Sequence, residues 1–292
     1  MRLVIKFNLA LLLGFAIGIG AAGFVSHRLL FENAREEILG SARMIMASAI
    51  GARTYTSKQV APLLRQLPGD EFLPQTVPAY AATEQFATLR AQFPDFAYKE
   101  AVLNPTNLRN KATDWEVDVV NRFRQYPDQK EMVVERDTPA GRSLALAKPI
   151  RIEDEACLRC HSTVDEAPPG LLRRYGPANG FGWQLHEVIG AQLVSVPMSL
   201  PIQRADTAFI TFMGSLGGVF LVIFVLLNIM LMAIVVRRVT RLAKLADEVS
   251  MGKLDAPEFV EGGKDEVSKL GQSFNRMKKS LAHAIRMLED QS

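Results

Sequence analysis

Both cysteines of the chain and one of its four histidines lie within five positions, in the stretch EACLRCHSTVDEAPPG. The spacing Cys157-x-x-Cys160-His161 is the attachment signature of c-type haem, in which two thiols form thioethers with the haem and the adjacent imidazole binds the iron. We therefore predict one covalently attached haem c, anchored by Cys157 and Cys160, with His161 as an axial iron ligand.

Three other uses of these cysteines compete with haem. A disulfide closed over two intervening residues would stabilise the fold only weakly, because it restricts the unfolded chain little. A redox-active thiol pair has the same Cys-x-x-Cys spacing. A structural zinc site usually needs four ligands, and His27, His186 and His283 are not at finger-like spacing from the motif. The specificity of the five-residue pattern favours haem over these alternatives.

The position of the motif must suit its chemistry, and two apolar segments bear on this. Residues 7–25 and 208–236 contain no charged residue, and each is long enough to cross a bilayer. Arg2 and Lys6 precede the first segment and an arginine-rich stretch beginning at Arg237 follows the second, so the positive-inside rule places both ends of the chain in the cytoplasm. Haem attachment and disulfide formation belong outside the bacterial cytoplasm, which agrees with an exported middle region.

These signals predict a multi-pass protein of the bacterial inner membrane. Its parts are a cytoplasmic N-terminus at 1–6, transmembrane helices at 7–25 and 208–236, a periplasmic domain at 26–206 and a cytoplasmic region at 237–292. A cleaved signal peptide is the alternative for the first segment, because small residues at 20–23 offer a processing site. The net charge of +3 gives no indication of nucleic acid binding, and we expect none.

The cytoplasmic region carries apolar residues at alternating spacings of three and four. One seam runs through Val239, Leu242, Ala246 and Val249, and a second through Val267, Leu270, Phe274, Met277, Leu281, Ala284 and Leu288. Between the seams lies a helix-breaking connector that contains Gly252, Pro257, Gly262 and Gly263.

Two short amphipathic helices joined in this way just inside a membrane span resemble a HAMP domain, the parallel four-helix dimeric relay of bacterial sensors. The resemblance is most specific at 252–255, 265–267 and 274–277. The stretch RRVTRLAKL lacks the proline that many HAMP domains have near the start of their first helix. A generic coiled coil is the alternative, and in either case the seams predict a homodimer, because they need partner helices to bury them.

The middle region mixes helical and strand patterns. A long helix is expected to continue from the first span through residues 26–60, with further helices near 80–92 and 112–126. Short runs rich in β-branched or alternating apolar residues predict strands near 96–104, 130–138, 143–152 and 188–198. The predicted fold class is α+β with one antiparallel sheet.

This region resembles the c-type haem sensor domains of bacterial signalling proteins, which are PAS-like in fold. The resemblance rests on RTYTSKQVAPLL, LNPTNLRNKATDWE, CLRCHS, YGPANGFGW and EVIGAQLVSVPM, which occur in order over nearly all of the exported region. It implies that Cys157 and Cys160 anchor the haem, that His161 is one axial ligand, and that the distal side faces the long N-terminal helix.

The second axial ligand stays open at this point. The resemblance suggests a cysteine on the long helix, but the chain has no third cysteine. His186, Met46 and Met44 are the candidate ligands, and each has a plain alternative, a turn residue for the histidine and helix packing for the methionines.

Two further residues near the end of the long helix are candidates for the haem pocket. Arg53 could pair with a haem propionate, because a guanidinium suits carboxylate geometry, and Tyr55 could line the distal side. Ordinary surface or interface positions are the alternative for both.

A haem domain between two spans and followed by a HAMP-like relay predicts a transmembrane sensor. Redox change at the haem, or binding of a small gas, would alter the packing of the HAMP helices. We expect the output in a separate cytoplasmic partner, because no kinase, cyclase or methyl-accepting region follows the second seam. A membrane-anchored cytochrome for periplasmic electron transfer is the alternative function. We expect no enzymatic activity, since we find no nucleophile with a base and no phosphate loop.

Overall fold

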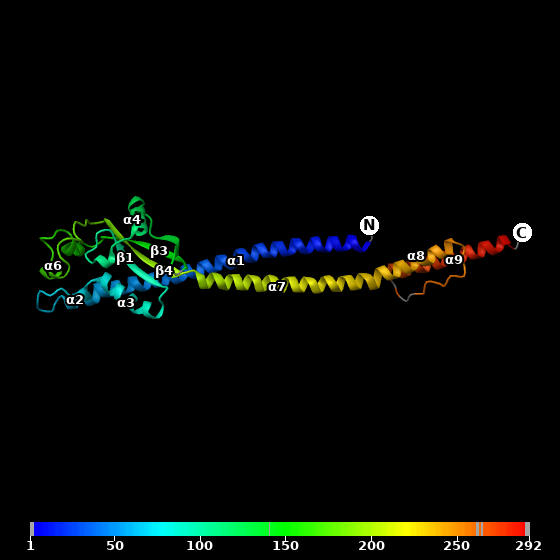
Figure 1. Cartoon of the computed structure of the whole chain (residues 1–292), viewed down its shortest axis with the longest axis horizontal. Coiled ribbons are helices and arrows are strands. Elements are labelled where there is room, and N and C mark those ends of the chain that lie inside the picture. Colours follow the sequence, from blue (N-terminus) through cyan, green and yellow to red (C-terminus); the bar gives the residue numbers. More distant parts are fainter. Residues whose placement is uncertain (1–2, 140, 261–262, 264, 290–292) are drawn as a thin grey trace. The chain divides into compact units, whose positions relative to one another are not determined.

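The computed structural model describes residues 3–139, 141–260, 263 and 265–289 (Figure 1). Arg2 and Gly262, which the sequence analysis assigned to a basic flank and to a connector, lie outside the described residues. The chain divides into two compact units, His27–Ala208 and the combination of Met1–Ser26 with Phe209–Ser292.

The unit at 27–208 is built on one antiparallel sheet of four strands. Its strands are β1 (Ala97–Val102), β2 (Met132–Thr138), β3 (Gly141–Arg151) and β4 (Val188–Pro197), in the order β1-β4-β3-β2. In the register, Tyr98 of β1 and Leu146 of β3 both lie opposite Val194 of β4. The four predicted strands and the α+β class are confirmed.

Helices cover both faces of this sheet (Figure 1). The long helix α1 (Leu3–Tyr55) packs Ile38, Ala42 and Met46 against one face, where they meet residues such as Leu146 and Val194. The helix α4 (Asp114–Gln125) packs on the other face through Val119, Val120 and Phe123. A third helix, α3 (Pro78–Gln92), lies against α1, where Ala82 and Phe86 contact Ala49. The predicted long helix and the two shorter ones are confirmed.

Shorter elements complete the unit. A π-helical turn (Thr56–Val60) follows α1 directly and leads into α2 (Ala61–Leu64). Single 3₁₀ turns lie at Pro74–Thr76, Leu108–Asn110 and Glu155–Cys157, and two short helices follow, α5 (Leu158–His161) and α6 (Pro169–Tyr175).

Two ion pairs join α1 to the region of β2 at the surface. Arg35 lies 3.1 Å from Glu135 and Arg43 lies 2.7 Å from Glu131, with both arginine side chains about half exposed. Pairs as exposed as these contribute little to stability, on the order of 0–1 kcal/mol, so the apolar contacts of α1 hold it on the sheet.

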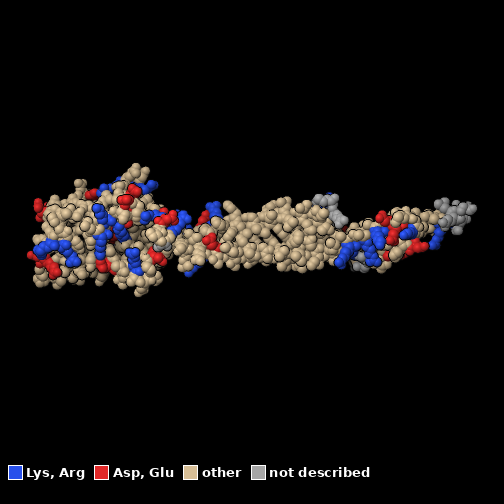
Figure 2. Space-filling view, viewed as in Figure 1, with Lys and Arg blue, Asp and Glu red and all other residues tan. Residues whose placement is uncertain are grey.

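The other unit contains most of the two apolar segments. Among the described residues, two helices are long and apolar enough to cross a membrane, one within 4–64 and one within 199–250. The second begins as α7 (Ser199–Met230) and passes through a π-helical turn (Leu231–Val236). Within this unit the rings of Phe15 and Phe220 stack with centroids 4.7 Å apart. Figure 2 shows no charged residue over most of the apolar stretch on the face that it draws.

The helices α8 (Arg237–Ser250) and α9 (Glu266–Glu289) pack against each other and against the connector between them. Their core is formed by Leu242, Leu245, Val249, Phe259 and Phe274. The side chain of Asn275 binds the backbone of Phe259 twice, as acceptor from its N–H and as donor to its carbonyl, each at 3.0 Å. These contacts fix the connector on α9.

Part of the predicted seam stays exposed within one chain. Leu270, Met277 and Leu281 of α9 are 56%, 59% and 43% exposed, although they continue the apolar stripe of Phe274. Helices that carry such a stripe normally bury it against partner helices.

Candidate functional site

The two cysteines and His161 lie on a short helical segment formed by the 3₁₀ turn at Glu155–Cys157 and by α5. Asp154 caps this segment, because its carboxylate accepts a hydrogen bond from the N–H of Ala156 at 2.8 Å. Residues separated by three and four positions share one side of a helix, so Cys157, Cys160 and His161 face the same way.

Both thiols are free and half-buried. Burial raises the pKa of Cys157, and the nearby carboxylate of Asp154 adds to this, whereas the positive charge of Arg53 opposes it. Burial also raises the pKa of Cys160, against the effects of Arg65 and Arg159. The thiols are therefore protonated near neutral pH, as expected of cysteines that pack rather than react as free thiolates.

The imidazole of His161 is held in one orientation. Its Nδ1 lies 2.7 Å from the carbonyl oxygen of Gly180 and 3.3 Å from Oγ1 of Thr106, and its ring stacks on Trp183 with centroids 3.9 Å apart. A carbonyl oxygen only accepts hydrogen bonds, so Nδ1 must donate and Nε2 keeps its lone pair. Burial lowers the pKa of His161, which also favours the neutral ring. A neutral imidazole fixed through Nδ1 is the arrangement typical of a metal-binding histidine.

The loop after α6 is attached to this segment by its backbone. The N–H of Gly182 donates to the carbonyl of Ser162 at 2.8 Å, and the N–H of Trp183 donates to that of His161 at 3.1 Å. Asn104 holds the same loop from the other side, accepting from the N–H of Gly180 at 3.1 Å and donating to the carbonyl of Phe181 at 3.3 Å. The stretches LNPTNL and YGPANGFGW thus meet at the histidine.

Apolar side chains surround the first cysteine. Val102, Ile152 and Ile189 are buried together, and Cys157, Leu158 and Trp183 pack against them. Such surroundings suit a flat apolar group beside the helical segment.

A polar network that joins α1 to the sheet lies next to these apolar residues. Nη1 of Arg53 donates to both carboxylate oxygens of Glu100, at 2.5 and 2.6 Å. Glu100 also accepts from the hydroxyl of Tyr98 at 2.8 Å, and Gln192 donates to that hydroxyl at 3.2 Å. Burial raises the pKa of Tyr98, so its hydroxyl stays protonated and acts as a donor to the carboxylate. Glu100 lies two residues before Val102, which packs with Cys157, so Arg53 is held near the motif but is engaged with a carboxylate of the protein itself.

The candidates for the second axial position lie in different environments. Met46 is fully buried in the core between α1 and the sheet, and Met44 is 74% exposed on the same helix. His186 lies exposed in the turn before β4 with φ of 66°, and its N–H donates to the carbonyl of Ile152 at 2.7 Å. Tyr55 is 57% exposed at the end of α1. A ligand role for Met46, Met44 or His186, and a place in the haem pocket for Tyr55, stay predictions.

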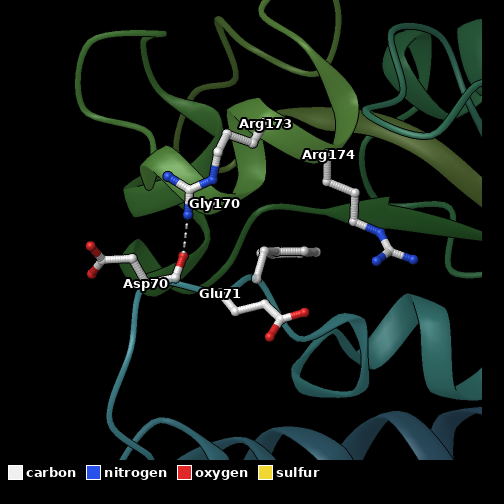
Figure 3. A pocket seen from close by; sticks show the side chains of 6 residues that line it. Asp70, Glu71, Gly170, Arg173 and Arg174 are labelled. Carbon is white, nitrogen blue, oxygen red and sulfur yellow. Dashed lines mark hydrogen bonds between the residues drawn. The ribbon is translucent and has the colours of Figure 1, made fainter.

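A separate pocket of about 290 Å³ lies between the loop at 70–72 and α6 (Figure 3). It is lined by Asp70, Glu71, Phe72, Gly170, Arg173 and Arg174. Arg173 donates to the backbone carbonyl of Asp70 at 2.8 Å, and a Cβ atom on Gly170 would collide with the same loop. The pocket is therefore a consequence of how the loop is attached to α6, and the thiols and His161 are not among its lining residues.

Sequence reasoning missed several residues of this site. Thr106, Gly180, Trp183 and Glu100 were not named, although three of them lie in stretches that carried the family resemblance. Thr106 lies 55 positions from His161 and Glu100 lies 47 positions from Arg53, whereas Gly180 and Trp183 reach His161 through the path of an irregular loop. Spacing alone gives none of these contacts. Among the residues that the structure describes, no three His, Cys, Asp or Glu side chains form a cluster for a bare metal ion.

Comparison with known families agrees with this architecture. A family model described as Tll0287-like, Tll0287, matches residues 31–197, more than half of the chain. The chain belongs to the Tll0287-like family. A HAMP domain follows at residues 230–283, which confirms the expected HAMP resemblance.

One solved structure is similar to this Tll0287-like chain. It is titled "Crystal structure of the cyanobacterial heme-protein Tll0287" and is 18% identical, with 55% of this chain and 95% of that chain covered and a TM-score of 0.43. No curated protein matches the chain significantly. The combination of a domain from a haem-protein family, a HAMP domain and two candidate membrane helices fits a membrane sensor.

Proposed function

We propose that the chain is a membrane-bound c-type haem sensor. Cys157 and Cys160 would carry one haem through thioether bonds, and Nε2 of His161 would bind its iron. The observation that carries this proposal is the hydrogen bond from Nδ1 of His161 to the carbonyl of Gly180, which leaves Nε2 as the basic nitrogen beside two free thiols.

The surroundings of the motif fit this group. The thiols lie on the same side of the helical segment as the histidine, next to the apolar cluster of Val102, Ile152 and Ile189. Bound there, haem would supply a one-electron couple and an iron site for small gases. We keep both redox change and ligand binding as the proposed stimulus.

We propose that none of the other candidate residues would be a firm second ligand of the iron. Met46 would have to leave a filled core to reach a metal, which costs about 2–5 kcal/mol when judged from the loss of a buried methionine side chain. His186 has an exposed side chain in the turn before β4, so surrounding residues would do little to hold it at a metal. A weak or exchangeable second ligand would favour a sensor of small molecules over a protein that only transfers electrons.

The signal is proposed to pass through the inner membrane to the HAMP domain. The haem domain would lie in the periplasm and the HAMP domain in the cytoplasm, with the arginines after 236 on the cytoplasmic side. The exposed stripe of Leu270, Met277 and Leu281 supports a homodimer, in which four HAMP helices pack together. A cytoplasmic partner would read the packing of these helices, and the proposed role is binding and signalling rather than catalysis.

Absorption spectra of the purified full-length protein test this proposal. We expect a covalent haem c spectrum, retained as haem stain after denaturing electrophoresis, that changes when carbon monoxide is added to the reduced protein. Replacing Cys157 and Cys160 by Ser should abolish the stain and leave membrane insertion unchanged. A spectrum indifferent to carbon monoxide would support two firm ligands and the electron-transfer function. Stain retained in the double Ser variant would exclude the attachment site.

A further inference from the structure

A buried ion pair joins α1 to β1 close to the attachment motif. The side chain of Glu100 is only 3% exposed and that of Arg53 is 26% exposed. Buried ion pairs are often no better for stability than apolar residues of similar volume, because removing both charges from water costs several kcal/mol. A role beyond stability is therefore worth seeking for this pair.

The pair interrupts an otherwise apolar face of α1. Ile38, Ala42, Met46 and Ala49 follow one another along the side of the helix that meets the sheet, and each is almost fully buried. Arg53 is the next residue of this stripe, one turn after Ala49. Its partner Glu100 lies two residues before Val102, which belongs to the apolar cluster against which Cys157 packs. The π-helical turn at Thr56–Val60 begins three residues after Arg53, and such turns are frequent at functional sites.

The network also reaches the strand that leads to the second membrane helix. Glu100 is fixed by the hydroxyl of Tyr98, and Tyr98 accepts a hydrogen bond from Gln192 of β4. β4 ends at Pro197, and α7 begins at Ser199. Both connections toward the membrane therefore contribute a side chain to one network.

We propose that the Arg53–Glu100 pair is the element through which a charge at the attachment motif acts on α1. This inference rests on the proposed function, and it adds which residues respond to a change of charge at the motif. The charge would arise by transfer of one electron from the site to a soluble one-electron acceptor. A positive charge added beside Cys157 repels the guanidinium and attracts the carboxylate, so α1 and β1 experience opposite forces. A change in the attraction between Arg53 and Glu100 would therefore shift the position of α1, the helix that continues toward the membrane.

The reduction potential of the haem-loaded protein tests whether a charge at the motif interacts with the Arg53–Glu100 pair. Glu100→Gln leaves the guanidinium uncompensated, and arginine cannot lose its proton in a protein, so the oxidised state becomes less favourable and the potential rises. We expect an effect on the order of tenfold in the oxidised-to-reduced ratio at fixed potential, about 59 mV for one electron. The double variant Arg53→Gln with Glu100→Gln removes both charges and should return toward the wild-type potential. Structural damage alone would make the double variant at least as abnormal as the single one.

A second ion pair of α1 provides the matched control. Glu131→Gln removes the partner of Arg43, which also joins α1 to the sheet region but lies ten residues before Arg53 on the helix. We expect no change in potential for this variant. Equal potentials in the wild type and Glu100→Gln, or equal shifts in Glu100→Gln and Glu131→Gln, would overturn the inference.

Two further measurements separate this inference from the proposed function. Hydrogen exchange of residues 49–60 should differ between the oxidised and reduced wild type, and this difference should disappear in the double variant; an unchanged difference would overturn the inference. In haem-free protein with Cys160→Ser, Glu100→Gln should speed alkylation of Cys157 by a neutral maleimide, since the free guanidinium stabilises the thiolate. If alkylation is faster but the wild-type chain never takes up haem, Arg53 lies close to Cys157 and the proposed function is refuted. An unchanged rate would refute the closeness of Arg53 to Cys157.

Discussion

The carbonyl oxygen of Gly180 accepts a hydrogen bond from Nδ1 of His161 at 2.7 Å, across nineteen positions of the sequence. This contact decides which nitrogen of the ring is available to a metal. It also makes the loop at 176–187 part of the site, although that loop carries no metal-binding side chain at the contact.

Substitution of Gly180 should damage the site more than substitution of another glycine of the same loop. Gly180 has φ of 88°, and a Cβ atom there would overlap Oγ1 of Thr106 and lie 2.8 Å from its Cα. Gly176 has φ of 77° with open space around it. We expect Gly176→Ala to cost about 1–3 kcal/mol through backbone strain alone. Gly180→Ala should cost more and also disturb His161.

Chemical denaturation and the haem spectrum, measured for both variants, check this prediction. Similar losses of stability with an unaltered spectrum in both would show that the Gly180 carbonyl does not orient the histidine.

Asn104→Ala should loosen the loop without a steric clash. It removes the hydrogen bonds to the N–H of Gly180 and the carbonyl of Phe181, each worth about 0.5–1.5 kcal/mol. Asn107→Ala is the control, because Asn107 lies in the same segment but only caps the N–H of Arg109 at 3.1 Å. We expect Asn104→Ala to lose about 1 kcal/mol more stability than Asn107→Ala, because it loses one bond more, and we expect a shifted absorption spectrum for Asn104→Ala only. An unshifted spectrum would limit Asn104 to a structural role.

Leu270→Glu should weaken dimers of the HAMP domain while leaving the fold of each chain intact, because this side chain is 56% exposed within one chain. A buried charge in the interface of a helical bundle is costly, so crosslinking of the cytoplasmic segment should fall several-fold. Gln272→Glu places the same charge at an exposed position off the stripe and should have no effect. Equal crosslinking in both variants would contradict the proposed interface, as would full crosslinking in Phe274→Glu.

Acid should weaken the start of α9 through Asp265. The N–H of Ser268 and the guanidinium of Arg238 hold the pKa of this carboxyl at about 2. The unfolded value is about 3.9, so the folded state binds fewer protons, and the stabilisation is complete above pH 4 and is lost as the pH falls toward 2. Helical content followed by circular dichroism between pH 5 and 2 should show this loss. It should be smaller in Asp265→Asn, and equal acid sensitivity of the two proteins would rule out the cap as the cause.

The periodic parts of this chain are readable from sequence, and the site is readable only in part. The strands at 132–138 and 188–197 are rich in β-branched residues. The helix α4 has the helical spacing of Val119, Val120 and Phe123, so local pattern and tertiary packing agree. The Cys157-x-x-Cys160-His161 motif is local as well. The partners of His161 come from residues 104–106 and 180–183, and their meeting depends on two loops whose paths no periodicity describes.

Arg53 illustrates why prediction of the rest fails. Its type suggested a propionate partner, but Nη1 is occupied by Glu100, which the register of β1 brings to the same face of the sheet. The short helix α6 and both π-helical turns were also missed, because seven residues or fewer carry too little periodicity to be recognised.

The π-helical turn at Leu231–Val236 determines the direction in which the apolar stripe of α8 faces. Such a turn holds one residue more than a regular α-helical turn, and each residue advances an α-helix by about 100° in azimuth. If the turn relaxed to regular α-helix, the apolar stripe of α8 would rotate by that amount about its own axis, with little lengthening of the helix. At these six residues, a small movement of α7 along its axis would be converted into a rotation of α8 about its own axis.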